Sequence, residues 1–153
     1  MVKSMFFKQA NVLVLGTILG IAGISFVDIK QAISQPAPPL SRVAITAVNS
    51  SQNPSWELIQ SGNFSTSKDH GGRSLCVQTE ERGYGQSQSV LFNGKRMVQK
   101  SSTAITGFGR IIVGWKREWC YTSSTAFSSG RVTFQATSIN FPRNTLSTAL
   151  NIR

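Results

Sequence analysis

The chain has 153 residues and carries 16 Lys and Arg against 6 Asp and Glu, so its formal net charge is +10. A chain of this length predicts one domain with its own core. One histidine and two cysteines exclude a tetrahedral zinc site built from those ligands, although carboxylates could still hold calcium. We therefore predict no metal and no cofactor.

The N-terminal segment is typical of an export signal. Lys3 and Lys8 precede an uncharged, mostly apolar run of 16 residues, 12–27. Small residues occupy the two positions of Ala32-Ile33-Ser34 that a signal peptidase inspects, so we predict a signal peptide over residues 1–34 and cleavage after Ser34. The alternative is an uncleaved membrane anchor at 12–27, although a spanning helix needs about 20 apolar residues.

Removal of residues 1–34 leaves 119 residues with a formal charge of about +8. The predicted location is secreted or periplasmic, and the basic charge belongs to the exported part. Such a domain attracts polyanions such as acidic polysaccharide, anionic lipid headgroups or nucleic acid. Plain solubility is the alternative explanation of the charge.

The exported part is predicted to contain a Pro-rich tether over residues 35–41 and a single all-β domain over residues 42–153. Ser and Thr supply 29 of the 119 exported residues, and the apolar runs are short and β-branched. We expect a small antiparallel β-sandwich or barrel of about eight short strands. Their ranges are 42–48, 57–64, 73–80, 87–92, 95–100, 108–122, 131–141 and 146–152. A short helix starting at Asn53-Pro54 and stopped by Gly62 is the alternative to the second strand.

The clearest turn signal is Asn93-Gly94, which can adopt the positive φ angles of a two-residue hairpin. The turn fixes a register in which Phe92 faces Lys95 and Val90 faces Met97 on the better core side. Leu91 then faces Arg96, and Ser87 faces Lys100, on the outer side.

Two cysteines in an exported domain predict one disulfide between Cys76 and Cys120. Leu75 and Val77 flank the first cysteine, while Trp119 and Tyr121 flank the second. Because neighbouring side chains in a strand point to opposite faces, both cysteines should point away from the apolar face. We therefore expect the disulfide to join neighbouring strands on the outer side of one sheet.

Catalytic signals are weak. His70, the only histidine, lies in a charged Gly-Gly segment beside Asp69, and neighbours in an extended chain cannot face each other. We interpret it as a turn residue and keep it as a weak catalytic candidate. Glu80 and Glu81 read as a solvated loop. The sequons at Asn49 and Asn63 are as many as chance predicts.

The basic residues are the remaining functional signal. Arg96 and Lys100 should share the outer face of the hairpin, and Arg110 and Lys116 the outer face of the long strand. The four would form one basic patch only if the hairpin and the long strand lie in one sheet with aligned outer faces. Binding to a polyanion through such a patch should weaken steeply with salt.

The stretch GWKREWCY, residues 114–121, can be read in three ways. Trp115, Trp119 and Tyr121 share a face with Arg117, and we favour a strand buried on that side, with Arg117 reaching out by its stem or forming a π contact. An exposed aromatic platform for sugar rings or bases, with Arg117 between the rings, is the second reading. The third is a tight turn at residues 116–118.

These patterns predict an exported, non-enzymatic protein of the cell envelope or extracellular space that binds an anionic surface or polymer. The predicted binding residues are Arg96, Lys100, Arg110, Trp115, Lys116, Arg117 and Trp119. One alternative is a small secreted hydrolase, such as a nuclease, that uses His70. Another is a structural or inhibitor-type interaction domain that uses a sheet edge or loop.

Overall fold

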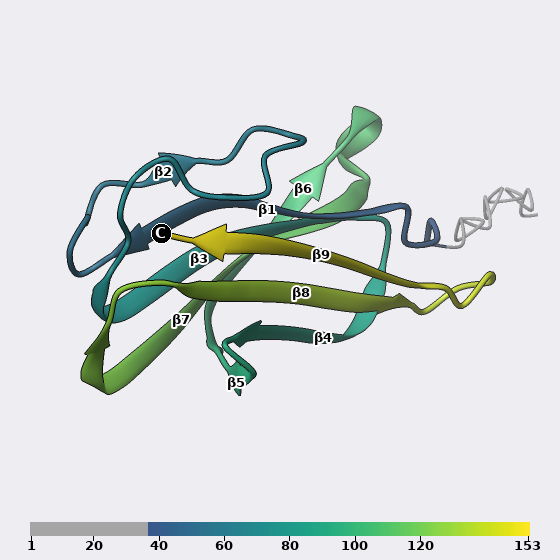
Figure 1. Ribbon diagram of the computed structural model, residues 1–153. Helices are drawn as coiled ribbons and strands as arrows, with labels where there is room; N and C mark the ends of the chain where they lie inside the picture. Colours follow the sequence, from purple (N-terminus) through teal and green to yellow (C-terminus); the bar gives the residue numbers. More distant parts are fainter. Residues whose placement is uncertain (1–36) are drawn as a thin grey trace, which may run out of the picture. The chain divides into compact units, whose positions relative to one another are not determined.

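The computed structural model describes residues 37–153, which form a sandwich of two antiparallel sheets (Figure 1). The first sheet has five strands in the order β2-β1-β3-β7-β6, and the second has four in the order β5-β4-β8-β9. The strands are β1 (Arg42–Ser50), β2 (Glu57–Leu58), β3 (Gly72–Arg82), β4 (Gly85–Phe92), β5 (Lys95–Arg96), β6 (Val98–Thr106), β7 (Ile112–Phe127), β8 (Gly130–Ser138) and β9 (Thr145–Ile152). The predicted all-β class, the antiparallel sandwich and the single disulfide are confirmed.

The only helical turn in residues 37–153 is the short 3-10 turn η1 (Phe108–Arg110), which joins β6 to β7. The same part of the chain has no helix long and apolar enough to cross a membrane. The predicted signal peptide, its cleavage position and the alternative anchor at 12–27 lie outside the described residues.

The core lies between the two sheets, because each central strand alternates buried apolar residues with polar residues that face outward. At one end of the core, the ring of Phe92 lies 5.4 Å from that of Tyr121 and 4.8 Å from that of Phe127. Tilted contacts of this kind are favourable between aromatic rings. The buried apolar residues are Leu40, Ile45, Val48, Leu75, Val77, Val90, Phe92, Met97, Trp119, Val132, Phe134, Ala136, Leu150 and Ile152.

The predicted hairpin register is confirmed near the turn, where Phe92 pairs with Lys95 and Leu91 with Arg96. Asn93 and Gly94 both have positive φ, as the turn requires. Beyond Met97, however, the chain leaves the second sheet, and β6 pairs with β7 in the first sheet. The predicted pairing of Ser87 with Lys100 is therefore wrong. The buried Met97 side chain marks the crossover point.

The segment between β1 and β3 contains neither the predicted helix near Asn53 nor a strand over residues 57–64. Only Glu57 and Leu58 are in a strand, and they pair with β1. Residues 64–70 of this segment run along the end of β9, where the Thr66 N–H donates to Asn151 O. Its polar contacts hold it there without regular structure.

One end of the sandwich gathers three connections, which we call the aromatic end. They are the β6–β7 tip (residues 107–111), the β8–β9 tip (residues 139–144) and the turn at residues 82–84. Residues 37–41, the described part of the predicted tether, lie against this end. Pro39 forms a bridge with Tyr84, and Leu40 is buried in the core. The first described residues are thus part of the fold.

Candidate functional site

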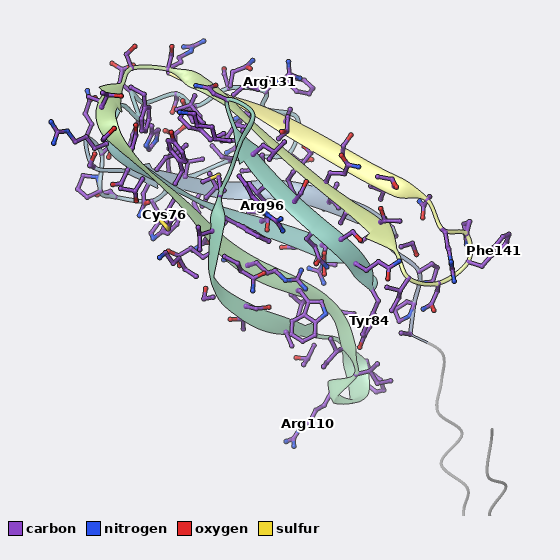
Figure 2. The ribbon with its side chains drawn as sticks, turned by 90° about the horizontal axis from the view of Figure 1, so that it is seen from below. Cys76, Tyr84, Arg96, Arg110, Arg131 and Phe141 are labelled. Atoms are coloured by element: carbon purple, nitrogen blue, oxygen red, sulfur yellow. A yellow bond between two sulfur atoms is a disulfide. The ribbon has the colours of Figure 1, made fainter. Side chains whose placement is uncertain are left out.

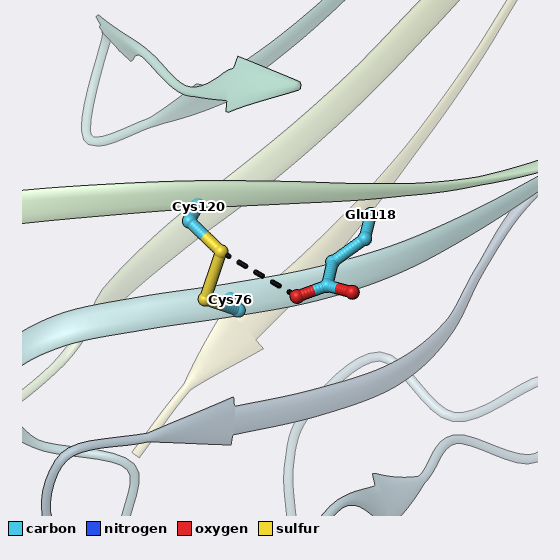
Figure 3. Close-up of side chains that lie close together, drawn as sticks. All are labelled: Cys76, Glu118 and Cys120. Carbon is cyan, nitrogen blue, oxygen red and sulfur yellow. Dashed lines mark hydrogen bonds between the residues drawn. A yellow bond between two sulfur atoms is a disulfide. The ribbon is translucent and has the colours of Figure 1, made fainter. Parts of the chain in front are cut away.

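The disulfide connects directly opposite residues of β3 and β7, Cys76 and Cys120, whose Cα atoms are 4.1 Å apart (Figure 3). The neighbouring pair, Val77 and Trp119, is buried, so the cysteines face the outer side of the first sheet. The predicted placement of the disulfide is confirmed.

Glu118 lies beside the disulfide, with its Oε1 atom 3.7 Å from Cys120 Sγ (Figure 3). Neither sulfur carries a hydrogen in the disulfide, so this approach is a contact and not a hydrogen bond. The group Cys76, Glu118 and Cys120 is compact enough for a metal ion, but thiolates are the metal ligands and both sulfurs are oxidised. The arrangement therefore does not form a metal centre in this state.

The inner face of β3 and β7 changes character along its length. Near the middle, Val77 pairs with Trp119 in the apolar core. Toward the aromatic end, Glu81 faces inward and forms an ion pair with Arg117, whose Nη1 atom is 2.5 Å from Glu81 Oε1. The Glu81 side chain is 0% exposed, and the Arg117 side chain is 11% exposed. The prediction that Glu81 lies in a solvated loop is wrong. Glu81 is part of β3, in which every second side chain faces the core, and its side chain is one of these.

Trp115 and Trp119 lie two residues before and two residues after Arg117 in β7. The Trp119 side chain is in the core, and its indole N–H donates to the Thr79 hydroxyl at 2.9 Å. Trp115 is half-buried, and the Arg117 guanidinium carbon lies 5.5 Å from its ring centroid. The favoured core reading therefore holds for Trp119, and the π contact of Arg117 is present. The reading of residues 116–118 as a tight turn is wrong, because β7 continues through them.

An open cleft lies where the chain crosses from one sheet to the other, and its volume is about 460 Å³. It is lined by Gln88, Arg96, Met97, Val98, Gln99 and Trp119. Figure 2 shows the labelled Arg96 side chain between the crossover and β4. We call this hollow the crossover cleft. Arg96 is its single charged lining residue, and Gln88 reaches from it to the buried Glu81, with Nε2 3.4 Å from Oε2.

The other predicted binding residues lie apart from this cleft. Lys100 is in β6 at a bulge, between Gln99 and Ser101. Lys116 is on the outer face of the first sheet, opposite Glu80, and Arg110 is at the tip between β6 and β7 (Figure 2). The condition for a single patch is not met, since the hairpin and the long strand belong to different sheets.

His70 is fully buried and does not lie at the predicted turn. Its Nε2 atom is 2.9 Å from Glu57 Oε2, and its backbone N–H donates to Arg153 O at 2.5 Å. Glu57 also accepts hydrogen bonds from the Ser67 N–H at 2.6 Å, the Ser67 hydroxyl at 2.9 Å and the Lys68 N–H at 3.1 Å. A buried ring with this partner fastens the segment to the end of β9 and presents no open face to a substrate.

The Glu57 network also sets the charge state of its carboxyl group. Burial opposes the charged form of Glu57, but the hydrogen bonds from Ser67, His70 and Lys68 outweigh it and lower the pKa of Glu57 from 4.5 to about 2. Glu57 is thus a carboxylate at any ordinary pH. Its role is to bind the loop backbone, because its oxygens already accept these hydrogen bonds.

Three residues of the cleft region were not predicted: Glu81, Gln88 and Gln99. The signal for Glu81 was present, because Arg117 on an apolar face requires a buried partner of opposite charge. Counting in steps of two from Leu75 and Val77 reaches Glu81 on the same face. Gln88 and Gln99 carry no comparable signal, since the crossover that brings them together is a long-range feature.

The family model described as "Domain of unknown function (DUF4879)" matches residues 35–152. This match starts at the residue after the predicted cleavage position and includes both sheets. A comparison with curated proteins finds no match. The matched region covers more than half of the chain, and the chain therefore belongs to the DUF4879 family.

Proposed function

We propose that this protein is an exported binding protein that recognises an acidic polysaccharide in the cell envelope or extracellular space, with the crossover cleft as its site. The observation that carries the proposal is the cleft lining. It combines a single cation, Arg96, with the largely buried Trp119 and the amides of Gln88 and Gln99. Its volume of about 460 Å³ is in the range of small-ligand sites.

The lining suits a sugar ring that carries an acidic group. A guanidinium binds a carboxylate or sulfate through two parallel hydrogen bonds. The Gln99 amide can donate to and accept from sugar hydroxyls, and Gln88, whose amide hydrogens already face Glu81 and Gly85 O, can accept from them. Glu81 is paired with Arg117, so it does not compensate the charge of Arg96. An anionic ligand is therefore favoured over a cationic one.

The charge of the whole domain supports the same ligand class. Residues 37–153 contain 13 Lys and Arg and 5 Asp and Glu. Glu80 and Glu81 are already held in ion pairs, the first of them by Arg82 at 2.7 Å, and Glu57 is held by hydrogen bonds from Ser67 and Lys68 and by its contact with His70. The excess of positive charge raises the rate of encounter with a polyanion, while the cleft supplies selectivity. The disulfide supports export, since disulfides persist in oxidising compartments.

The test compares binding of residues 35–153 to a polyuronate with elution from a simple cation exchanger. We expect Arg96→Gln to weaken the affinity for polyuronate at least about tenfold, because a charge-assisted bidentate contact is lost. Two matched controls also remove one exposed charge, Lys95→Gln beside the cleft and Arg131→Gln in the second sheet. An equal loss in all three variants would reduce the interaction to net charge and overturn the proposal.

A sheet edge gives the second candidate, an interaction domain. β6 is the last strand of the first sheet, and most of its residues are exposed. Its unpaired side offers backbone N–H and C=O groups to a strand of another chain. Sedimentation of the protein over a wide concentration range tests self-pairing, and a constant monomer mass would exclude it.

A further inference from the structure

Two phenylalanines stand fully in solvent at the aromatic end. Phe108 at the β6–β7 tip is 101% exposed, and Phe141 at the β8–β9 tip is 92% exposed. Ile111, at the base of the first tip, is 53% exposed. Phenylalanine is usually buried, so two almost fully exposed phenylalanines on two loops of one end are a candidate contact surface for an apolar partner.

The tips hold these side chains outward by their own hydrogen bonds. The Gly107 N–H donates to Ile111 O at 2.8 Å and closes the first tip. In the second tip, the Asn144 N–H donates to Pro142 O and the Ser138 N–H donates to Asn144 O, each at 2.8 Å. Phe108 and Phe141 are therefore exposed in the folded protein, without any opening of the core.

Each tip also carries an exposed arginine within two residues of its phenylalanine, Arg110 in the first and Arg143 in the second. Neither tip contains an acidic residue. Each of the two loops presents an exposed ring next to a guanidinium. This pair of groups fits a partner that has an apolar layer beneath a negatively charged surface. A bilayer with anionic phospholipid has this order of layers, since aromatic rings enter the headgroup boundary and arginine binds phosphate.

Backbone hydrogen bonds connect the two tips into one end. The Gly83 N–H donates to Val113 O at the base of the first tip, and the Tyr84 N–H donates to Pro38 O. The Ile139 N–H of the second tip donates to Tyr84 O at 3.1 Å. Figure 2 shows Arg110 and Phe141 projecting at this end, with Tyr84 between them, while Arg131 lies at the opposite end.

The described chain also begins at this end. The Asn140 side-chain amide donates to Ala37 O, and Leu40 N–H donates to the Ser138 hydroxyl at 3.1 Å. Whatever precedes residue 37 in the chain, the apolar run 12–27 included, is connected to the domain here. A bilayer against the aromatic end is thus compatible with both the cleaved and the anchored form of the chain.

We propose that the aromatic end is a peripheral membrane-docking surface that binds an anionic phospholipid bilayer, with Phe108 and Phe141 entering the headgroup boundary and Arg110 and Arg143 on lipid phosphates. This surface is separate from the crossover cleft. Docking by it would leave the cleft open to a soluble polymer.

The experiment measures binding of residues 35–153, whose core and disulfide lie within this range, to vesicles of phosphatidylcholine with and without 30% phosphatidylglycerol. The unmodified protein should sediment with the anionic vesicles and much less with the neutral ones. Phe108→Ala with Phe141→Ala should lower the partition coefficient by about tenfold or more, because two rings no longer leave water. Arg110→Gln with Arg143→Gln should lower it and also flatten its dependence on salt.

Two matched variants at the opposite end serve as controls. Phe64 is 76% exposed and its carbonyl accepts the N–H of Asn151 near the end of β9, so Phe64→Ala removes an exposed ring far from the tips. Arg131→Gln removes an exposed arginine that pairs with Asn151. Both should bind vesicles as the unmodified protein does. Equal losses in control and tip variants, or equal binding to neutral vesicles, would overturn the proposal. Polyuronate binding should survive the tip variants, so the two proposals can fail separately.

Discussion

Arg117 and Glu81 form an ion pair inside the sandwich, with Nη1 and Oε1 2.5 Å apart and side chains that are 11% and 0% exposed. The contact is an ion pair without well-aligned hydrogen-bond geometry, since Glu81 Oε1 has no hydrogen-bond partner among the described residues. The guanidinium also faces the Trp115 ring. Two charges are thus held at the margin of an apolar core, and Gln88, which lines the crossover cleft, contacts one of them, Glu81.

Removal of either partner should destabilise the fold unequally. Arg117→Met leaves the fully buried Glu81 carboxylate with only Gln88, and we expect a loss of about 3–5 kcal/mol in the free energy of unfolding. Glu81→Gln should cost less, because the Arg117 side chain is already 11% exposed and its guanidinium can turn toward solvent. Urea unfolding measures both. The double variant should lose less than the sum of the single losses; additive losses would show that the two residues are not coupled.

The low pKa of Glu57 predicts a specific loss of stability in acid. The pKa of Glu57 in the fold is about 2, below the ordinary 4.5. Between pH 2 and pH 4.5 the unfolded chain therefore binds a proton that the folded chain does not bind. The contribution of Glu57 is full above pH 4.5 and disappears as the pH falls to about 2. It amounts to at most about 3 kcal/mol. The measurement is the free energy of unfolding of Glu57→Gln and the unmodified protein between pH 2 and 6.

The difference between these two proteins isolates Glu57, because the other carboxyl groups titrate in both. It should be largest near neutral pH and shrink toward pH 2. His70→Ala should also destabilise the fold, since it removes a buried partner of Glu57. A His70→Ala protein with unchanged stability would contradict the fastening role.

The disulfide should contribute to stability more than to the choice of fold. Its cysteines are 44 residues apart in the sequence. Closing a loop of this length lowers the entropy of the unfolded chain and so raises its free energy by about 4 kcal/mol. The replacement of both cysteines by Ala should lower the melting temperature by on the order of 10–20 °C. Far-ultraviolet circular dichroism should stay unchanged, because the β3–β7 ladder already aligns the two strands. Loss of the β signal at low temperature would contradict this expectation.

Gly83 should tolerate no side chain. It has a φ of +85°, and a Cβ atom there would meet the carbonyl of Pro39. We expect Gly83→Ala to cost about 2–4 kcal/mol, from backbone strain together with displacement of residues 38–40. Gly94 is the matched control, with a φ of +78° and no neighbouring group within 4 Å of the position that a methyl carbon would occupy. Gly94→Ala should cost only the strain, about 1–2 kcal/mol, in thermal unfolding. Equal costs would mean that residues 38–40 are not fixed against the turn.

Local patterns predicted the parts of the fold that depend on neighbours in sequence. The register at Asn93-Gly94 follows from the turn geometry, and the position of the disulfide follows from the alternation around Cys76 and Cys120. The crossover after Met97 could not be predicted, because alternation shows that a residue faces a core but not which sheet carries it. β6 itself lacks a clear apolar alternation, and its pairing with β7 defines it.

The buried titratable residues were missed for a similar reason. His70 and Glu57 are 13 residues apart, and neither side chain has a local reason to be inside. Glu81 could have been found by parity from Leu75, together with the need of Arg117 for a buried partner. The cleft could not, since it depends on where two sheets end relative to each other. Sequence patterns thus specify strands and faces better than the hollow between them.

The described chain begins at the aromatic end and finishes with Arg153 at the opposite end, and β1 and β9 run in the same direction (Figure 1). A pull between the two termini would therefore draw β1 along β3 and β9 along β8. Antiparallel ladders resist such sliding because many hydrogen bonds must break together. A domain held at its aromatic end and pulled at Arg153 would therefore be mechanically strong along the direction in which it is stretched.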